Sequence, residues 1–485
     1  MRFLNFQNIT VLRRSRYSLA AFFLFINFCV FLMNTGNLFA VGLYSSSFNA
    51  PSGSIDGMTL ALGGYPLDIA MNPANLTVSE TKKFEVGGSV PYMHIRYQDA
   101  YNDPDPALAY TNNINIKQAV FLPHMGLIVP LTKKLSYGAA LYTLGGAGIE
   151  LNGIKRNTPT GTTLNNWAGT SLPITGDMKQ ITENITTRFF ILKLTNGLAY
   201  NFGRLSVGAG LEINYAEHYT LYEYRDITGS FRIPGKGFEY KSDRAFSPGG
   251  IFGLTFRASE HVKIAYSYQT ISHLPLNGRT RFDLDRPDQF YRQSNVSYIF
   301  KLPERHNIGM AITRNSWTWV LDASYLKFAS TNSSINQILE YPLLDTPIGP
   351  TNQMISHVNA KDVYMVGGGA QYKPAKIAYR GGYSYSSLML GEDGSAPMFA
   401  GTLHQHIVFM GSGVDMGDYE LNFGYNHLFG KTLKGNDMSD WDLSHAMYPI
   451  QSPADVILKN IRMPFFTHST YFSVDAFLFG VTLKY

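Results

Sequence analysis

The chain has 485 residues, of which 45% are hydrophobic and 14% aromatic, including 45 Gly, 31 Tyr and 32 Phe. This is too apolar for a disordered chain, and the charged fraction of 15% lies well below the roughly 25% typical of soluble domains. The net charge of +5 falls to +1 without residues 1–40, which hold four Arg and no other charged side chain, so the composition argues against a nucleic-acid partner.

The N-terminus has the pattern of an exported protein. Four Arg precede an acid-free apolar stretch over residues 19–33, and the small residue Ala40 follows. The stretch is shorter than the roughly 20 residues that a spanning helix needs, so we predict a secretory signal peptide over residues 1–40. The single Cys, Cys29, lies within it. The mature chain would therefore have no disulfide, no thiolate nucleophile and no Cys-based zinc site.

Residues 41–80 carry Gly, Ser and Pro without strand alternation. This predicts that the segment is separate from residues 81–485, where an alternation of period 2 predominates. At the C-terminus, Phe477, Phe479 and Tyr485 share one face with other apolar residues, and stretches 205–215 and 419–425 alternate in the same way. Such faces suit lipid on one side and a polar or small-residue lumen on the other. A secreted β-sandwich would show similar alternation and is the alternative on pattern alone.

The connections between strands favour a transmembrane barrel over a sandwich. Short links and long polar links alternate strictly along the chain, and this requires fourteen antiparallel strands with both ends on the periplasmic side. The expected short turns are 130–134, 201–204, 257–260, 314–316, 373–375 and 413–417, and the expected long extracellular loops are 98–117, 148–185, 223–247, 273–305, 330–361, 389–403 and 429–465.

Tyr and Trp support the same interpretation, because these amphipathic side chains gather at the two bilayer interfaces. Six of them fall on predicted lipid faces near strand ends: Trp317, Trp319, Tyr325, Tyr379, Tyr383 and Tyr425. We therefore predict an all-β chain that forms an antiparallel barrel in the outer membrane of a double-membraned bacterium, in contact with its lipids.

One motif lies in the segment that precedes the barrel. Asp68 is followed by Asn72-Pro73-Ala74 and then Leu76. This resembles the N-terminal hatch signature of the FadL/TodX family, outer-membrane channels for long-chain fatty acids and aromatic hydrocarbons. Further stretches resemble the family in order: 130–138, 205–211, 302–304 with 317–322, and 379–385.

The resemblance implies a fourteen-stranded barrel whose lumen holds residues 41–80 as a hatch. It also implies passive uptake of a hydrophobic small molecule, a fatty acid or a hydrocarbon. External loops would capture the ligand, the hatch would shift, and the ligand would leave sideways where the third strand kinks inward. That strand carries Gly145, Gly146 and Gly148. Clustered Gly indicates a bulge or a close backbone approach, with the start of the next loop as the alternative. Asn72 would hydrogen-bond near this kink.

Two further roles follow from the resemblance. Arg225 and Arg380 are candidates for binding a ligand carboxylate, with a solvated loop or lumen charge as the alternative, since the basic residues of the fatty-acid channels have no clear match here. Phe479 and Tyr485 resemble the C-terminal signal that barrel-assembly machinery reads. We expect a monomer without a cofactor.

Two other classes of barrel are alternatives: an enzyme acting on lipids, and a general porin or surface adhesin. An enzyme would need aligned Ser and His, and no Gly-x-Ser-x-Gly elbow occurs. His404 and His406 share a predicted face without a third ligand, so we expect no metal site. An open porin has no use for a forty-residue N-terminal segment. We therefore predict a non-enzymatic channel.

Overall fold

The computed structural model describes residues 48–158, 163–282, 293–332, 334–343, 351–357, 360–390, 404–435 and 466–485. The predicted signal peptide and residues 41–47 of the predicted hatch lie outside these ranges. Among the described helices, none has the length and apolar character that crossing a membrane requires.

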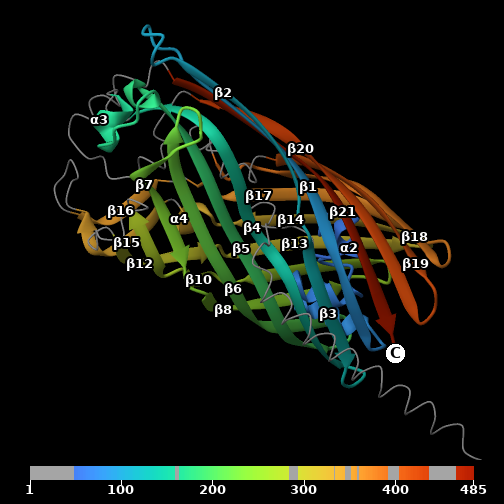
Figure 1. Cartoon of the computed structure of the whole chain (residues 1–485). Helices are drawn as coiled ribbons and strands as arrows, with labels where there is room; N and C mark the ends of the chain where they lie inside the picture. Colours follow the sequence, from blue (N-terminus) through green and yellow to red (C-terminus); the bar gives the residue numbers. More distant parts are fainter. Residues whose placement is uncertain are drawn as a thin grey trace, which may run out of the picture.

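The strands form one closed antiparallel sheet of fourteen wall strands, which confirms the predicted barrel. The sheet closes where β1 pairs with β21, from Lys83 opposite Lys484 to Tyr101 opposite Phe466. Several wall strands are interrupted and consist of consecutive pieces: β2 with β3, β7 with β8, β9 with β10 and β11, β12 with β13, β14 with β15, and β16 with β17 (Figure 1).

The bounds of the strands are β1 (Lys83–Tyr101), β2 (Tyr110–Ala119), β3 (Leu122–Pro130), β4 (Leu135–Asn157), β5 (Gln180–Asn201), β6 (Leu205–Asp226), β7 (Arg232–Ser242), β8 (Ala245–Arg257), β9 (Val262–Gln269), β10 (Ser272–Pro275), β11 (Gly278–Phe282), β12 (Gln293–Leu302), β13 (Arg305–Arg314), β14 (Trp317–Leu326), β15 (Ser334–Leu343), β16 (Thr351–His357), β17 (Val363–Tyr372), β18 (Ile377–Ser386), β19 (His404–Asp415), β20 (Tyr419–Gly435) and β21 (Phe466–Lys484). Short helices α3 (Leu164–Ala168), η3 (Thr175–Asp177) and α4 (Ala329–Asn332) lie in links between them.

The outer surface of the barrel is apolar. Leu211, Phe423 and Phe477 are all more than half exposed, and each comes from one of the three stretches in which alternation predicted a lipid face. Four of the predicted interfacial aromatics are exposed as well: Trp317, Trp319, Tyr379 and Tyr383. The alternate residues of these strands point inward, as the pleat of a strand requires.

All six predicted short turns join neighbouring wall strands at one end of the barrel, the end at which the C-terminus lies (Figure 1). The predicted loops were too long at several places. For example, β1 continues to Tyr101, β4 to Asn157 and β6 to Asp226, and each extends into a region expected to be loop. Polar and charged residues such as Asp99, Asn152 and Arg225 in these extensions hid their strand character, because they lie beyond the apolar belt.

The described part of the N-terminal segment, residues 48–79, lies inside the barrel near the short-turn end (Figure 1). It contains three short helices: α2 (Ala50–Gly53), η1 (Pro66–Ala70) and η2 (Pro73–Val78). These helices contact strands on opposite sides of the lumen, among them β4, β5, β6, β8, β19 and β20. We refer to residues 48–79 as the inner segment.

Candidate functional site

The lumen changes character along its length, and β5 shows the change on one strand. Its buried inward residues, read from the long-loop end to the short-turn end, are Ile185, Thr187, Phe189, Ile191, Lys193, Thr195, Gly197 and Ala199. The strand thus begins with apolar side chains, continues through a polar level and ends in small residues. The small residues lie where the inner segment approaches the wall, since a Cβ on Gly197 would lie 3.2 Å from Cδ1 of Ile69.

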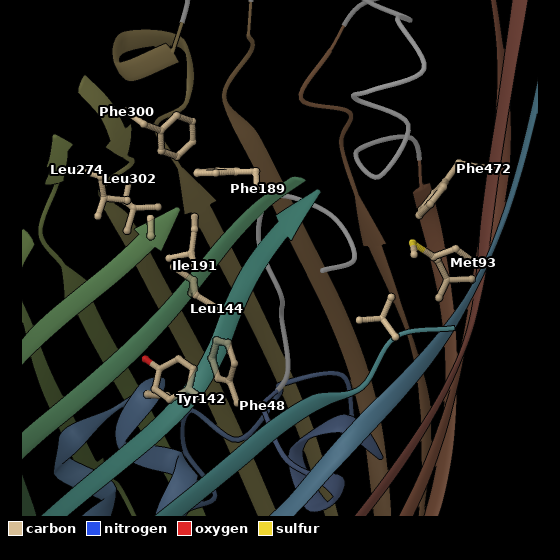
Figure 2. Close-up of a cluster of buried hydrophobic side chains, with 14 of the residues drawn as sticks. Phe48, Met93, Tyr142, Leu144, Phe189, Ile191, Leu274, Phe300, Leu302 and Phe472 are labelled. Atoms are coloured by element: carbon tan, nitrogen blue, oxygen red, sulfur yellow. The ribbon is translucent and has the colours of Figure 1, made fainter. Parts of the chain in front are cut away.

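The apolar level continues around the barrel. Figure 2 shows Phe189, Ile191, Leu274, Phe300 and Leu302 on one side of the lumen and Met93 and Phe472 on the other. All belong to one cluster of buried apolar residues from β1, β5, β10, β12 and β21. We call these seven residues the apolar lumen cluster. Inward apolar side chains at this level distinguish the barrel from a water-filled porin, whose interior is polar.

Aromatic rings extend this surface. The centroids of Phe189 and Phe300 lie 4.9 Å apart at 72°, an edge-to-face arrangement. His218 lies 5.5 Å from Phe189 and 5.2 Å from Tyr240, measured between ring centroids. The position therefore offers flat apolar faces together with few polar groups, which is the usual chemistry of a site for an apolar ligand.

A buried polar pair follows the apolar side chains on β5 and faces β6. Lys193 Nζ lies 2.9 Å from Glu212 Oε2, and both side chains are almost completely buried. Gln269 Nε2 donates to the other carboxylate oxygen at 2.6 Å. The charge of Lys193 is therefore already matched, as a buried charge must be.

The Asn72-Pro73-Ala74 motif lies at the start of η2 and docks on β6 and β8. Asn72 is fully buried, and its Nδ2 donates to the carbonyl of Leu60 at 2.9 Å and to Thr255 Oγ1 at 3.0 Å. Its Oδ1 accepts from the backbone N–H of Ala74 at 3.0 Å and caps η2. The partner expected from the resemblance, near the Gly cluster of the third strand, is thus wrong: the wall group that Asn72 binds belongs to β8.

Two glycines make this docking possible. A Cβ on Gly208 of β6 would lie 2.4 Å from the backbone nitrogen of Ala74, and one on Gly253 of β8 would lie 1.9 Å from Asn72 Oδ1. Glycine within a strand is a signal of close backbone approach. Neither glycine was predicted as a docking position, although a Gly within a strand is visible in the sequence at both places.

The remaining motif residues are also buried in the inner segment. Leu76 packs on the wall at Gly138 of β4, where a Cβ would lie 2.3 Å from Leu76 Cδ2. Asp68 accepts from the backbone N–H of Tyr65 at 2.8 Å and so caps the first turn of η1. Burial raises the pKa of Asp68 to about 7.

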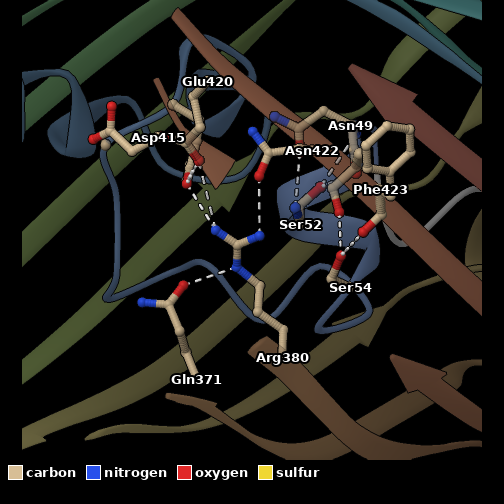
Figure 3. Close-up of polar contacts among 12 residues, drawn as sticks. Asn49, Ser52, Ser54, Gln371, Arg380, Asp415, Glu420, Asn422 and Phe423 are labelled. Carbon is tan, nitrogen blue, oxygen red and sulfur yellow. Dashed lines mark hydrogen bonds and ion pairs between the residues drawn. The ribbon is translucent and has the colours of Figure 1, made fainter. Parts of the chain in front are cut away.

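Arg380, a candidate for carboxylate binding, instead lies between the wall and the inner segment (Figure 3). Its Nε donates to Gln371 at 2.8 Å, its Nη1 to Asn422 at 3.0 Å and its Nη2 to the hydroxyl of Tyr65 at 2.8 Å. That hydroxyl donates to Glu420 Oε1 at 2.6 Å. The guanidinium therefore has partners on three sides, and sequence reasoning missed both Tyr65 and Glu420.

The other candidate, Arg225, lies near the loop end of β6. Its Nη1 donates to the carbonyl of Gly229 at 3.2 Å, and its Nη2 lies 3.9 Å from Glu223. These contacts stabilise the turn that follows β6. The structure does not bring Arg225 and Arg380 together, because they lie at opposite ends of the barrel.

The third wall strand, β4, departs from regular geometry at its Gly cluster. The register between β4 and β5 shifts between Thr143 and Gly145. Thr143 to Gly146, together with Gly148 and Ile149, are all buried, so alternate exposure is lost here. A bulge of this kind is what clustered Gly indicates.

On its other side, β4 loses its neighbour at the same level. Its ladder with β3 ends at Tyr142 opposite His124, and within the described residues of both strands no ladder joins β4 to β2. The two strands meet again near their loop ends. There, Asn112 Nδ2 donates to the carbonyl of Lys155 at 3.0 Å, and Arg156 Nη1 lies 2.8 Å from Asp99 of β1. The wall therefore has an interrupted ladder between these two points.

The candidate assembly residues lie on the outer face of β21 and at its end. Phe479 is 42% exposed and stacks on Phe121, with ring centroids 6.1 Å apart. Tyr485 is 37% exposed, and its backbone N–H donates to the carbonyl of Lys82 at 3.0 Å. Both aromatic rings are accessible from outside the barrel.

The comparison with known proteins rests on structure. No family model and no curated protein sequence matches the chain. A FadL homologue from Pseudomonas aeruginosa superposes with a TM-score of 0.65 at 13% identity, covering 92% of this chain and 99% of that one. The P. putida toluene transporter TodX gives 0.63 at 14% identity, with 91% and 99% covered. The Ralstonia pickettii toluene transporter TbuX gives 0.55 at 16%, with the same coverage. The chain therefore shares the fold of these proteins.

Proposed function

We propose that this chain is an outer-membrane channel for the passive uptake of apolar molecules and that it belongs with the FadL/TodX channels. The observation that carries the proposal is the apolar lumen cluster above a docked inner segment. A lumen of this kind offers apolar contacts to a ligand, and the inner segment occupies the route that water would take. The fold shared with a FadL homologue and with toluene transporters supports the same function.

The inner segment acts as the hatch in this proposal. Hydrogen bonds and close packing hold it to the wall through Asn72, Leu76 and Tyr65. Each contact is made by a small number of groups, so a shift of the segment does not require the barrel to unfold. Wall strands satisfy their backbone groups among themselves.

The interrupted ladder beside Gly145 and Gly146 is the proposed lateral exit. Backbone groups that lack a ladder partner are the part of a barrel wall that can separate at the lowest cost. These residues of β4 are buried in this structure. A ligand can therefore leave here only if β4, the side chains that cover it or the inner segment moves.

The contacts of Lys193 and Arg380 support an uncharged apolar ligand, such as a hydrocarbon, over a fatty acid. Lys193 is paired with Glu212, and Arg380 is held by Tyr65 and its neighbours. A ligand carboxylate would have to displace one of these partners, and leaving a buried charge unpaired is costly.

Uptake into vesicles tests the proposal. Purified protein in liposomes should speed the entry of toluene or a fluorescent apolar probe, and extracts of the purified protein should contain apolar molecules detectable by mass spectrometry. Oleate should compete weakly if the ligand is uncharged. Rapid flux of sugars without any acceleration of the apolar probe would show a general porin and would overturn the proposal.

A further inference from the structure

A cavity of about 650 Å³ opens at the short-turn end of the barrel and shares no residue with the apolar lumen cluster. Three neighbouring turns form its sides: the turn between β3 and β4, the turn between β5 and β6, and the turn between β8 and β9. The end of the inner segment, including Ala74 and Ser79, closes its inner wall. The cavity is therefore a vestibule between the inner segment and the periplasmic turns, and we call it the turn pocket.

The turn pocket is strongly basic. Its lining contains five cationic side chains and one acidic residue, Glu80. The cations are Lys133, Lys134, Arg204, Arg257 and Lys263. Among the residues that the structure describes, none of the five forms an ion pair. The positive charge is thus available to a ligand from outside the chain.

Two of these cations oppose each other directly. Arg257 of β8 and Lys263 of β9 are partners in the strand register. Like charges at facing positions destabilise a strand pair. An anion bound between them would turn this repulsion into attraction.

Hydroxyl side chains also line the pocket. Ser136 and Ser206 offer neutral donors, whereas the hydroxyls of Thr77, Ser79 and Thr255 already donate within the chain. Guanidinium groups with several hydroxyls are the usual ligands of phosphate, whose oxygens accept many hydrogen bonds at once. A cavity of this size lies within the range of ligand sites and exceeds what a bare phosphate ion needs.

The surroundings of the pocket indicate where such a group comes from. Leu131 and Phe202 lie on the turns that bear the cations and are 53% and 65% exposed. Leu198 and Phe256, a few residues along the same strands, are half exposed on the lipid face. The pocket mouth is therefore at the level of lipid headgroups. Basic clusters at this level attract anionic lipids.

We propose that the turn pocket binds a phosphate group, and that this group is the headgroup of an anionic phospholipid in the inner leaflet of the outer membrane. The inference rests on the membrane location in the proposed function and adds a lipid site distinct from the transport route. A lipid bound there would link the inner segment to three turns of the wall.

Native mass spectrometry of the full mature chain in neutral detergent tests the proposal. Phosphatidylglycerol, phosphatidylcholine and glycerol 3-phosphate would be added separately to wild type and to a Lys134→Gln, Lys263→Gln double variant. Each cation near a lipid surface contributes roughly a fivefold gain in affinity, so the double variant should bind phosphatidylglycerol about thirtyfold more weakly. Glycerol 3-phosphate should compete with the lipid on wild type.

A matched control removes two lysines from another turn at the same end. Lys373 and Lys376 lie between β17 and β18 and do not line the turn pocket. Lys373→Gln, Lys376→Gln should retain phosphatidylglycerol as wild type does. Equal losses in both double variants would reduce the effect to net charge and overturn the site. Binding of glycerol 3-phosphate without the lipid would overturn the lipid assignment. Apolar-probe uptake by the same variants should stay at the wild-type rate, which keeps this test separate from that of the proposed function.

Discussion

Near the short turns, in what we call the lower region, the inner segment fills the lumen, and the wall residues that face it are small or polar. Nearer the long loops, in what we call the upper region, the inward residues are large and apolar, and they face one another across the lumen (Figure 2). In the lower region, Gly208 and Gly253 leave no room for a side chain where Ala74 and Asn72 approach the wall. In the upper region, Phe189 and Phe300 offer ring faces without a hydrogen-bonding partner. One barrel wall thus supports two different interiors, one that specifies a docked segment and one that suits a ligand.

The largest expected effect comes from filling the space that the lower region reserves for the inner segment. Gly208→Ala places a Cβ against the backbone of Ala74, which cannot move without moving η2. Overpacking costs about 1–3 kcal/mol, and a Cβ 2.4 Å from backbone atoms places this variant at the upper end of that range. The undocked population of the inner segment should therefore rise on the order of a hundredfold, and leakage in planar bilayers should rise with it.

The control is Gly250→Ala on β8, where the nearest atom, Thr270 Cγ2, would lie 3.6 Å from the new Cβ. This variant should conduct as wild type does. Wild-type conductance in Gly208→Ala would show that the inner segment does not close the lumen.

The second expected effect concerns the wall beside the upper region. Gly145→Val adds an isopropyl group where β4 is buried, so the bulge should straighten or the interrupted ladder should become blocked. Uptake of an apolar probe should be largely lost while the barrel still folds. Gly368→Val is the matched control, because its nearest neighbours are ordinary contacts at 3.7 and 3.8 Å. If both variants take up the probe at the wild-type rate, the ligand leaves by another path.

The barrel itself was predictable because its determinants are local. Alternation at stretches such as 205–215 depends only on the pleat, and each short turn joins adjacent strands. The strand count followed from the spacing of those turns. Strand ends were not predictable, since Tyr101 and Asp226 lie in polar extensions that have no lipid to select apolar residues.

The candidate site was less predictable, because its contacts join residues far apart in the chain. Asn72 and Thr255 are separated by 183 positions, and Tyr65 and Glu420 by 355. The motif indicated that residues near Asn72 were special, and the Gly cluster indicated the irregular strand. Neither pattern carries information about which wall strand a buried amide meets. Arg380 was a candidate for binding a carboxylate, but its partners come from other strands and from the inner segment, which lie beside it only because the barrel closes.

A smaller effect is expected from changing the ligand surface of the upper region. Phe300→Ala removes one ring of the edge-to-face pair and about 1–3 kcal/mol of apolar contact for a ligand. Apolar-probe binding, measured by fluorescence titration, should weaken roughly tenfold. Phe423→Ala deletes the same ring from the lipid face, where it is 54% exposed, and should bind normally. Equal binding by the two variants would remove the apolar lumen cluster from the site.

The smallest expected effect concerns Tyr65 of the inner segment, whose hydroxyl donates to Glu420 and accepts from Arg380. Tyr65→Phe keeps the ring, which lies 5.8 Å from the guanidinium, and removes only the hydroxyl. Arg380 and Glu420 still face each other at 3.8 Å, so the loss should be limited to about 1 kcal/mol, the net value of one hydrogen bond. Hydrogen exchange of the inner segment should therefore accelerate about fivefold, which is far less than the change that Gly208→Ala causes. Tyr379→Phe, one residue before Arg380 on the lipid face, is the control and should exchange at the wild-type rate. Gly208→Ala is expected to have the larger effect because it creates a steric overlap, whereas Tyr65→Phe removes one hydrogen bond. If the two variants had equally large effects, the polar network around Tyr65, and not the close packing at Gly208, would hold the inner segment in place.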